Sequence, residues 1–124
     1  MKTVMIIALG GAAGSVARYG VQVYVYKLYP FIFPIGTFLV NILGCLLIGI
    51  IYGLSEKGNL LTPELRMLLT TGFCGGFTTF STFAYENVNL LSRSDFLYAG
   101  IYTLGSVILG IAGVYLGILV VKSF

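Results

Sequence analysis

The feature that most constrains this chain is the length of its apolar stretches, which only short polar segments separate. Charged side chains make up 9% of the 124 residues, whereas soluble domains carry about 25%. The apolar stretches are continuous and do not alternate with polar residues, which argues against a transmembrane β-barrel. The seven Lys and Arg are scattered and form no basic face for nucleic acid. The sequence therefore predicts a single-domain, all-α integral membrane protein.

Four stretches have the length that a membrane-spanning helix requires, roughly 20 mostly apolar residues. We expect helices over residues 3–26, 33–54, 64–91 and 95–121. Thr62 and Ser94 are candidate capping residues before the third and fourth helices, and Pro63 suits a first helical turn. Pairs of glycines four residues apart occur at 10 and 14, 49 and 53, and 113 and 117. Such spacing predicts close helix packing in lipid.

Charges at the ends of these helices bear on orientation. An even number of spans puts both termini on one side of the membrane. Four Lys or Arg lie on that side and two on the other, and Arg18 lies nearer to the side with two. Excess positive charge normally marks the cytoplasmic side. This bias is weak, so two interpretations stay open: termini inside, or insertion in both orientations with pairing into an antiparallel dimer.

Polar residues at membrane depth are costly and usually functional. Thr37 and Asn41 share one face of the second span, and Tyr102 and Ser106 share one face of the fourth. Interhelical hydrogen bonding would explain the first pair without any ligand. Arg18 either extends to the headgroups or makes a cavity mouth attractive to anions.

The segment "GFCGGFTTFSTFAYE" at 72–86 is the most polar part of the third span. Gly75-Gly76, followed by Thr78-Thr79, predicts an interruption of that helix. Non-helical backbone at this depth is tolerated only where it is buried in protein or lines a cavity. The free carbonyls of such a break can hold a cation, and its free N–H groups favour an anion.

Two phenylalanines follow the break at helical spacing. Phe80 and Phe83 face the same way, with Thr79 beneath Phe83 and Glu86 one turn above it. Phenylalanine ring edges are positive and favour anions. Hydroxyl and amide donors can replace the water around an anion, and no carboxylate other than Glu86 comes near mid-depth. This pattern predicts passage of a small, strongly hydrogen-bonding anion without a motor.

The sequence resembles the Fluc (CrcB) family of bacterial and archaeal fluoride channels over nearly its whole length. The resemblance rests on "GGAAGSVARY" at 10–19, "GTFLVNILG" at 36–44 and "GFCGGFTTFSTF" at 72–83. It implies a fluoride-selective passive channel in the cell (plasma) membrane, not an enzyme, which exports cytoplasmic fluoride and so lowers its toxicity. It also implies a dual-topology homodimer of antiparallel four-helix subunits.

The resemblance further implies roles for individual residues. Phe80 and Phe83 match the pore phenylalanines, and the residues matching the rest of the fluoride path are Asn41, Ser81, Thr82, Thr37, Thr79, Tyr102 and Ser106. Gly75 and Thr78 match the positions whose backbone carbonyls hold a central structural sodium ion. Arg18 and Glu86 match an arginine and a glutamate of the vestibule or of the structural framework, without a firm role.

Two alternatives come from other classes. A proton-coupled small multidrug exporter would have similar size and helix number, but such exporters use a glutamate in the first helix, where this chain has no acid. A structural subunit that transports nothing would not need polar faces on three helices.

Overall fold

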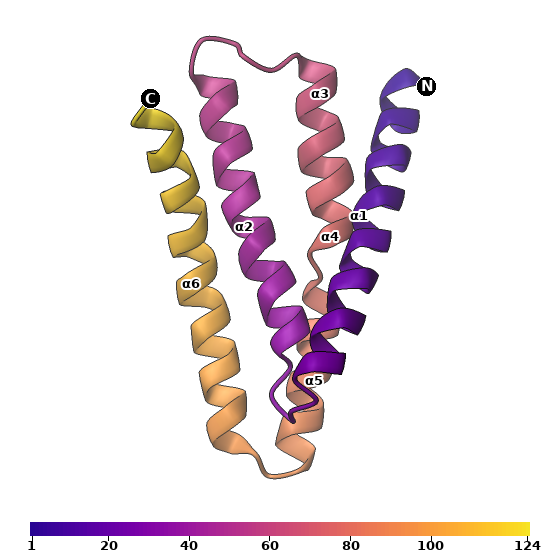
Figure 1. The fold of residues 1–124 in the computed structure, drawn as a ribbon, viewed down its shortest axis with the longest axis vertical. Helices are drawn as coiled ribbons and strands as arrows, with labels where there is room; N and C mark the ends of the chain where they lie inside the picture. The colour runs from indigo at the N-terminus through magenta and orange to yellow at the C-terminus, as the bar shows by residue number, and fades with distance from the viewer.

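Helices make up the whole fold of the computed structural model, which describes residues 1–124. Three helices are long and apolar enough to cross a membrane: α1 (Lys2–Leu28), α2 (Ile35–Glu56) and α6 (Phe96–Lys122). The remaining crossing is built from pieces: α3 (Pro63–Met67), the π-helical η1 (Leu68–Cys74), α4 (Gly75–Phe77) and α5 (Phe80–Ser92). The all-α membrane fold with an interrupted third span, expected from the sequence, is confirmed (Figure 1).

Both termini lie at one end of the bundle, and the α1–α2 and α5–α6 connections lie at the other (Figure 1). Thr62 caps α3 as expected, because its hydroxyl accepts a hydrogen bond of 3.1 Å from the Leu65 amide. Ser94 does not cap α6: its backbone has a φ of 61° and the helix begins after Asp95. Ser94 instead supplies the left-handed turn between α5 and α6.

Glycines determine which helices pack most closely. A Cβ on Gly117 would lie 2.5 Å from the Leu46 carbonyl oxygen, so α6 approaches the backbone of α2. A Cβ on Gly10 would lie 2.5 Å from the Leu68 carbonyl oxygen, so α1 approaches the start of η1. The glycine spacing in the sequence therefore marks two closely packed pairs, α2 with α6 and α1 with η1.

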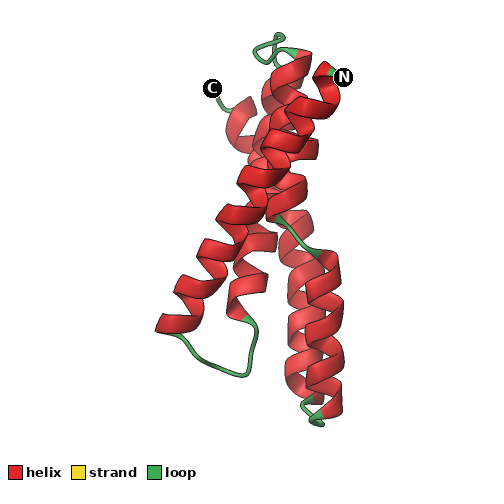
Figure 2. Ribbon diagram, turned by 90° about the vertical axis from the view of Figure 1, so that its right-hand side faces the viewer, coloured by secondary structure: helices red, strands yellow, loops and turns green.

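The interruption of the third span lies at Thr78 and Thr79, which have extended backbones (Figure 2). The expectation that Gly75-Gly76 breaks the helix is wrong, because both glycines are helical and Gly75 has φ −61° and ψ −37°. Gly76 serves close packing instead, since a Cβ there would lie 2.5 Å from the Gly11 carbonyl oxygen. The break comes where the chain leaves this contact with α1.

The break changes the neighbours of the third span. Before it, η1 and α4 pack on α1; after it, α5 packs on α6. No Cα atom of α1 lies within 8 Å of a Cα atom of α5, and Figure 2 shows the two helices diverging below the break. This divergence creates space on the side of the bundle away from the termini.

Candidate functional site

One concave site lies beside the break. We call it the Asn41 hollow; its volume is about 320 Å³. Its polar lining comes from α2, the break and α6, and its aromatic lining from the start of α5. The lining residues include Asn41, Thr78, Thr79, Phe80, Phe83 and Ser106. Six of the residues singled out in the sequence are thus brought together.

Asn41 braces the break. Its Oδ1 accepts a hydrogen bond of 2.8 Å from the Thr79 amide, and its Nδ2 donates one of 3.1 Å to the Thr79 carbonyl oxygen. The interhelical bonding that the sequence left open therefore exists. A side-chain amide carries two N–H donors, so this pairing leaves one N–H of Asn41 available at the hollow.

The hollow also contains an unpaired hydroxyl. The Ser106 Oγ has no hydrogen-bond partner although the atom is buried. Buried polar groups in native proteins almost always have a partner. Ser106 lines the hollow, so its hydroxyl is a hydrogen-bonding group that the chain itself leaves unused there.

Phe80 and Phe83 place their rings next to each other at the hollow, with centroids 5.6 Å apart and planes inclined by 41°. The Phe83 ring also lies 4.9 Å from that of Tyr102. Tyr102 is fully buried, whereas the Phe80 side chain is 79% exposed. The Phe83 ring is thus fixed by packing within the chain, whereas the Phe80 ring is exposed.

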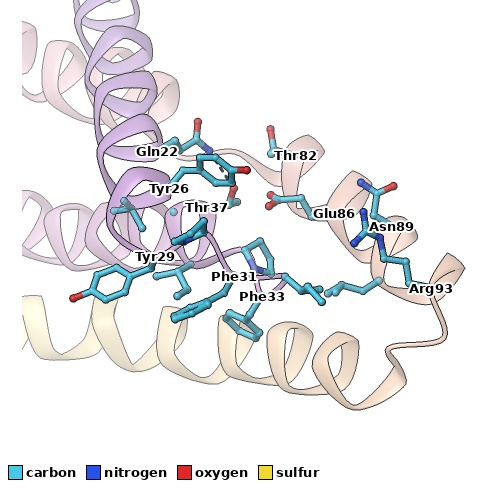
Figure 3. Close-up of a pocket in the computed structure, with 17 residues that line it drawn as sticks. Gln22, Tyr26, Tyr29, Phe31, Phe33, Thr37, Thr82, Glu86, Asn89 and Arg93 are labelled. Carbon is cyan, nitrogen blue, oxygen red and sulfur yellow. Dashed lines mark hydrogen bonds between the residues drawn. The ribbon is translucent and has the colours of Figure 1, made fainter.

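A second, larger space lies between α1 and α5 (Figure 3). We call it the Glu86 cavity; its volume is about 530 Å³. Thr37, Thr82 and Glu86, all singled out in the sequence, line it. In Figure 3 the Glu86 carboxylate points into the cavity towards Thr37, and the cation Arg93 lies on the outer side.

Two polar contacts connect the cavity with the hollow. The Thr79 hydroxyl donates a hydrogen bond of 3.0 Å to the Thr82 hydroxyl. The Tyr102 hydroxyl reaches Glu86 Oε1 at 3.5 Å, while its ring packs on Phe83. Donor groups therefore follow one another from the Glu86 cavity to the Phe80–Phe83 pair without an intervening cation.

Some candidates lie elsewhere. Ser81 is exposed, with its hydroxyl 3.3 Å from that of Thr79, and lines neither space. Arg18 is half-buried on α1 and also lines neither space. Sequence reasoning missed Gln22, whose Nε2 donates a hydrogen bond of 3.1 Å to the Thr37 hydroxyl. The feature that identified Thr37, a polar side chain within an apolar span, could also have identified Gln22.

The break leaves carbonyl oxygens without their helical donors. In a continuous helix the Thr79 amide would donate to the Gly75 carbonyl, and the Thr82 amide to the Thr78 carbonyl. Here these amides donate to Asn41 Oδ1, at 2.8 Å, and to the Thr79 hydroxyl, at 3.2 Å. The two carbonyl oxygens that the family resemblance assigned to a cation are therefore free of those bonds.

The arrangement suits an anion better than a divalent metal. Its donors are uncharged hydroxyl and amide groups beside aromatic rings, and no group of three or more His, Cys, Asp or Glu could hold a metal ion. Uncharged donors can replace the hydration of a small anion without binding it so tightly that it cannot leave.

Comparison with known proteins gives concordant matches. The family model described as "CrcB-like protein, Camphor Resistance (CrcB)" matches residues 5–118. A Flavobacterium psychrophilum protein named fluoride-specific ion channel FluC is 46% identical over 99% of both chains. Proteins of the same name from Phocaeicola vulgatus and Chlorobaculum tepidum are 48% and 50% identical. They align with 95% and 98% of this chain and with 97% and 96% of their own lengths.

Proposed function

The chain belongs to the CrcB family, and from that premise we propose that it is a fluoride-selective passive channel. Passive export would lower the toxicity of cytoplasmic fluoride. The hydrophobic spans and the bacterial relatives support placement in the cell (plasma) membrane. Fluoride entering as neutral HF from an acidic exterior would ionise inside and leave through the channel as the ion.

The observation that carries this proposal is the content of the Asn41 hollow. Asn41, which has a spare amide N–H, Ser106, whose hydroxyl is unpaired, and the rings of Phe80 and Phe83 line one space. Fluoride is small and accepts strong hydrogen bonds, so these donors suit it. A ring edge adds a positive contact that a cation would not find.

The route outward runs through hydroxyl groups. Thr79 and Thr82 are hydrogen-bonded to each other, and Thr82 lines the Glu86 cavity, as does Thr37. An ion leaving the hollow can exchange one hydroxyl partner for the next and then reach the open cavity. No step needs a charged carrier or a covalent change, which suits passive conduction.

We infer that two copies form an antiparallel homodimer. The polar groups of Asn41 and Thr79 at the hollow are poorly suited to lipid, and a second copy would cover them. The weak asymmetry of Lys and Arg between the two ends is compatible with insertion in both orientations. A single cysteine in the 93–95 connection, on a background lacking Cys45 and Cys74, should react with reagents added to either side of intact cells. Labelling from one side alone would contradict the antiparallel arrangement.

A structural sodium ion fits the free carbonyl oxygens of Gly75 and Thr78. Hard cations prefer oxygen ligands, and uncharged carbonyls lack the charge that favours calcium or magnesium. When bound, sodium would supply positive charge to backbone oxygens that lost their helical donors. Long dialysis into sodium-free N-methylglucamine buffer should lower fluoride flux while leaving selectivity over chloride nearly unchanged. Unchanged flux would mean that these carbonyls need no sodium.

The direct test of the function is efflux from liposomes that contain the purified chain. Fluoride should leave rapidly down its gradient when a potassium ionophore carries the balancing charge, and chloride should stay inside. Equal rates for the two anions, or no fluoride efflux above protein-free liposomes, would contradict the proposal.

A further inference from the structure

Glu86 is a carboxylate, which is unexpected in a route for an anion. It is the only carboxylate that lines the Glu86 cavity, and it comes from the same face of α5 as Phe83 and Thr82. The Tyr102 hydroxyl reaches Glu86 Oε1 at 3.5 Å, and in Figure 3 the Glu86 carboxylate points towards Thr37. A negative side chain held only by hydroxyl donors occupies the environment that a permeating anion would use.

The hydrogen bonds around Thr37 direct its proton. Gln22 Nε2 donates to the Thr37 hydroxyl oxygen at 3.1 Å, which uses that oxygen as an acceptor. A hydroxyl has a single proton to donate, and in Figure 3 the Glu86 carboxylate points towards Thr37. Thr37 is buried, at 4% exposure, and lines the same cavity as Glu86, so the carboxylate is an available acceptor for its proton.

The proton of the Tyr102 hydroxyl has few possible acceptors. The residue is completely buried, and its hydroxyl reaches Glu86 Oε1 at 3.5 Å. That distance is long for an oxygen–oxygen hydrogen bond, which is usually about 2.7–2.8 Å. The carboxylate is therefore held loosely, and another anion with a smaller radius can take its place at the same donors.

We propose that Glu86 is a tethered anion that competes with fluoride for the hydroxyl groups of Thr37 and Tyr102. This inference rests on the proposed fluoride channel and assigns Glu86 a role in it. When the carboxylate swings away or becomes neutral, the two hydroxyls turn their protons to the incoming fluoride. While it is charged and in place, fluoride must displace it, so more fluoride is needed to fill the route.

The competition depends on pH because only the charged carboxylate is an effective competitor. The other titratable or charged groups that face the cavity are Tyr26 of α1, Tyr29 of the following connection and Arg93 of α5's end. Tyr102 of α6 does not line the cavity but reaches Glu86 with its hydroxyl, and the lining residues of α2 include no titratable group. Tyrosine and arginine ordinarily keep one charge state near neutral pH. Between acidic and neutral pH the change of charge therefore belongs to Glu86, and the half-saturating fluoride concentration is higher once the carboxylate is charged.

The test compares wild type with Glu86→Gln and with Glu56→Gln, which makes the same chemical change on an exposed residue at the other end of the bundle. Initial efflux from liposomes is measured against internal fluoride concentration at about pH 4 and about pH 8, below and well above the ordinary pKa of a glutamate carboxyl group. Protein-free liposomes correct for HF leak. Gel filtration checks assembly.

We expect Glu86→Gln to lower the half-saturating fluoride concentration about tenfold at the higher pH, because a like charge near the path is removed. We also expect the variant to lose the pH response, and Glu56→Gln to behave as wild type. A structural role for Glu86 would reduce maximal flux without lowering half-saturation.

An assembled Glu86→Gln channel with wild-type half-saturation would overturn the inference. If the variant fails to assemble, the wild-type measurement alone tests the inference. A wild-type half-saturating fluoride concentration that is the same at both pH values would also overturn the inference. Wild type without fluoride flux would overturn the proposed function and this inference together, whereas flux with unchanged half-saturation would overturn the inference alone.

Discussion

Replacing Asn41 with alanine removes the side chain that braces the break, and the expected cost can be worked from its two hydrogen bonds. The variant leaves the Thr79 amide and carbonyl without partners at 2.8 and 3.1 Å. Interhelical side-chain hydrogen bonds in membrane proteins average about 0.6 kcal/mol, which sets a lower limit of about 1 kcal/mol for the pair. Unsatisfied buried groups cost about 1–3 kcal/mol each, which sets an upper limit of about 6 kcal/mol.

The environment of Thr79 decides between these limits. Thr79 is buried, at 7% exposure, while Asn41 is half-buried. The Thr79 backbone is extended and cannot return its amide to Gly75 without rebuilding the break. We therefore expect Asn41→Ala to lower the free energy of unfolding by about 2–3 kcal/mol, above the membrane average but below two fully stranded groups.

The assay is reversible unfolding in mixed micelles, followed by circular dichroism. The matched control is Asn89→Ala, because Asn89 is exposed and makes no side-chain hydrogen bond within the chain. That control should change stability by less than about 0.5 kcal/mol. If Asn41→Ala matched the control, Asn41 would not brace the break and its assignment here would fail.

Further predictions concern glycine packing and the unpaired hydroxyl. Gly76→Ala should destabilise the fold by about 1–3 kcal/mol, because its Cβ would lie 2.5 Å from the Gly11 carbonyl oxygen. Gly20→Ala is the control, because Gly20 has open space around it. Equal thermal stability of the two variants would contradict the packing role of Gly76. Ser106→Ala should leave stability within about 0.5 kcal/mol of wild type, since no hydrogen bond is lost. It should nevertheless lower fluoride efflux about tenfold, because an ion loses a donor; unchanged efflux would show that the Ser106 hydroxyl does not meet the ion.

The sequence predicted the interruption of the third span but not its position. Gly75-Gly76 looked like the helix breaker because glycine is a poor helix former. In the structure, close packing on α1 keeps these glycines helical, and the extended residues are Thr78 and Thr79. Asn41 supplies the missing partners for the Thr79 backbone. A contact between residues 38 positions apart could not be read from local propensity.

The polar faces predicted for single helices were only part of the site. Helical spacing placed Phe80 near Phe83, and their rings are neighbours in the structure. Spacing could not show that Thr37 and Thr82 would line a different space from Asn41, because that depends on α5 leaving α1 after the break. The same divergence brings Glu86 to Tyr102 of α6.

The measurement that tests the central claim most directly is fluoride efflux, by ion-selective electrode, from liposomes containing wild type, Phe80→Ile, Phe83→Ile or Phe96→Ile. Isoleucine keeps apolar bulk and removes the ring edge. Phe96 is exposed at the start of α6, away from the hollow, and serves as the matched control. We expect rapid fluoride efflux from wild type and Phe96→Ile, and a sharp loss in Phe80→Ile and Phe83→Ile while all four assemble alike. Wild-type efflux from both hollow variants would contradict the claim that fluoride passes beside these two rings.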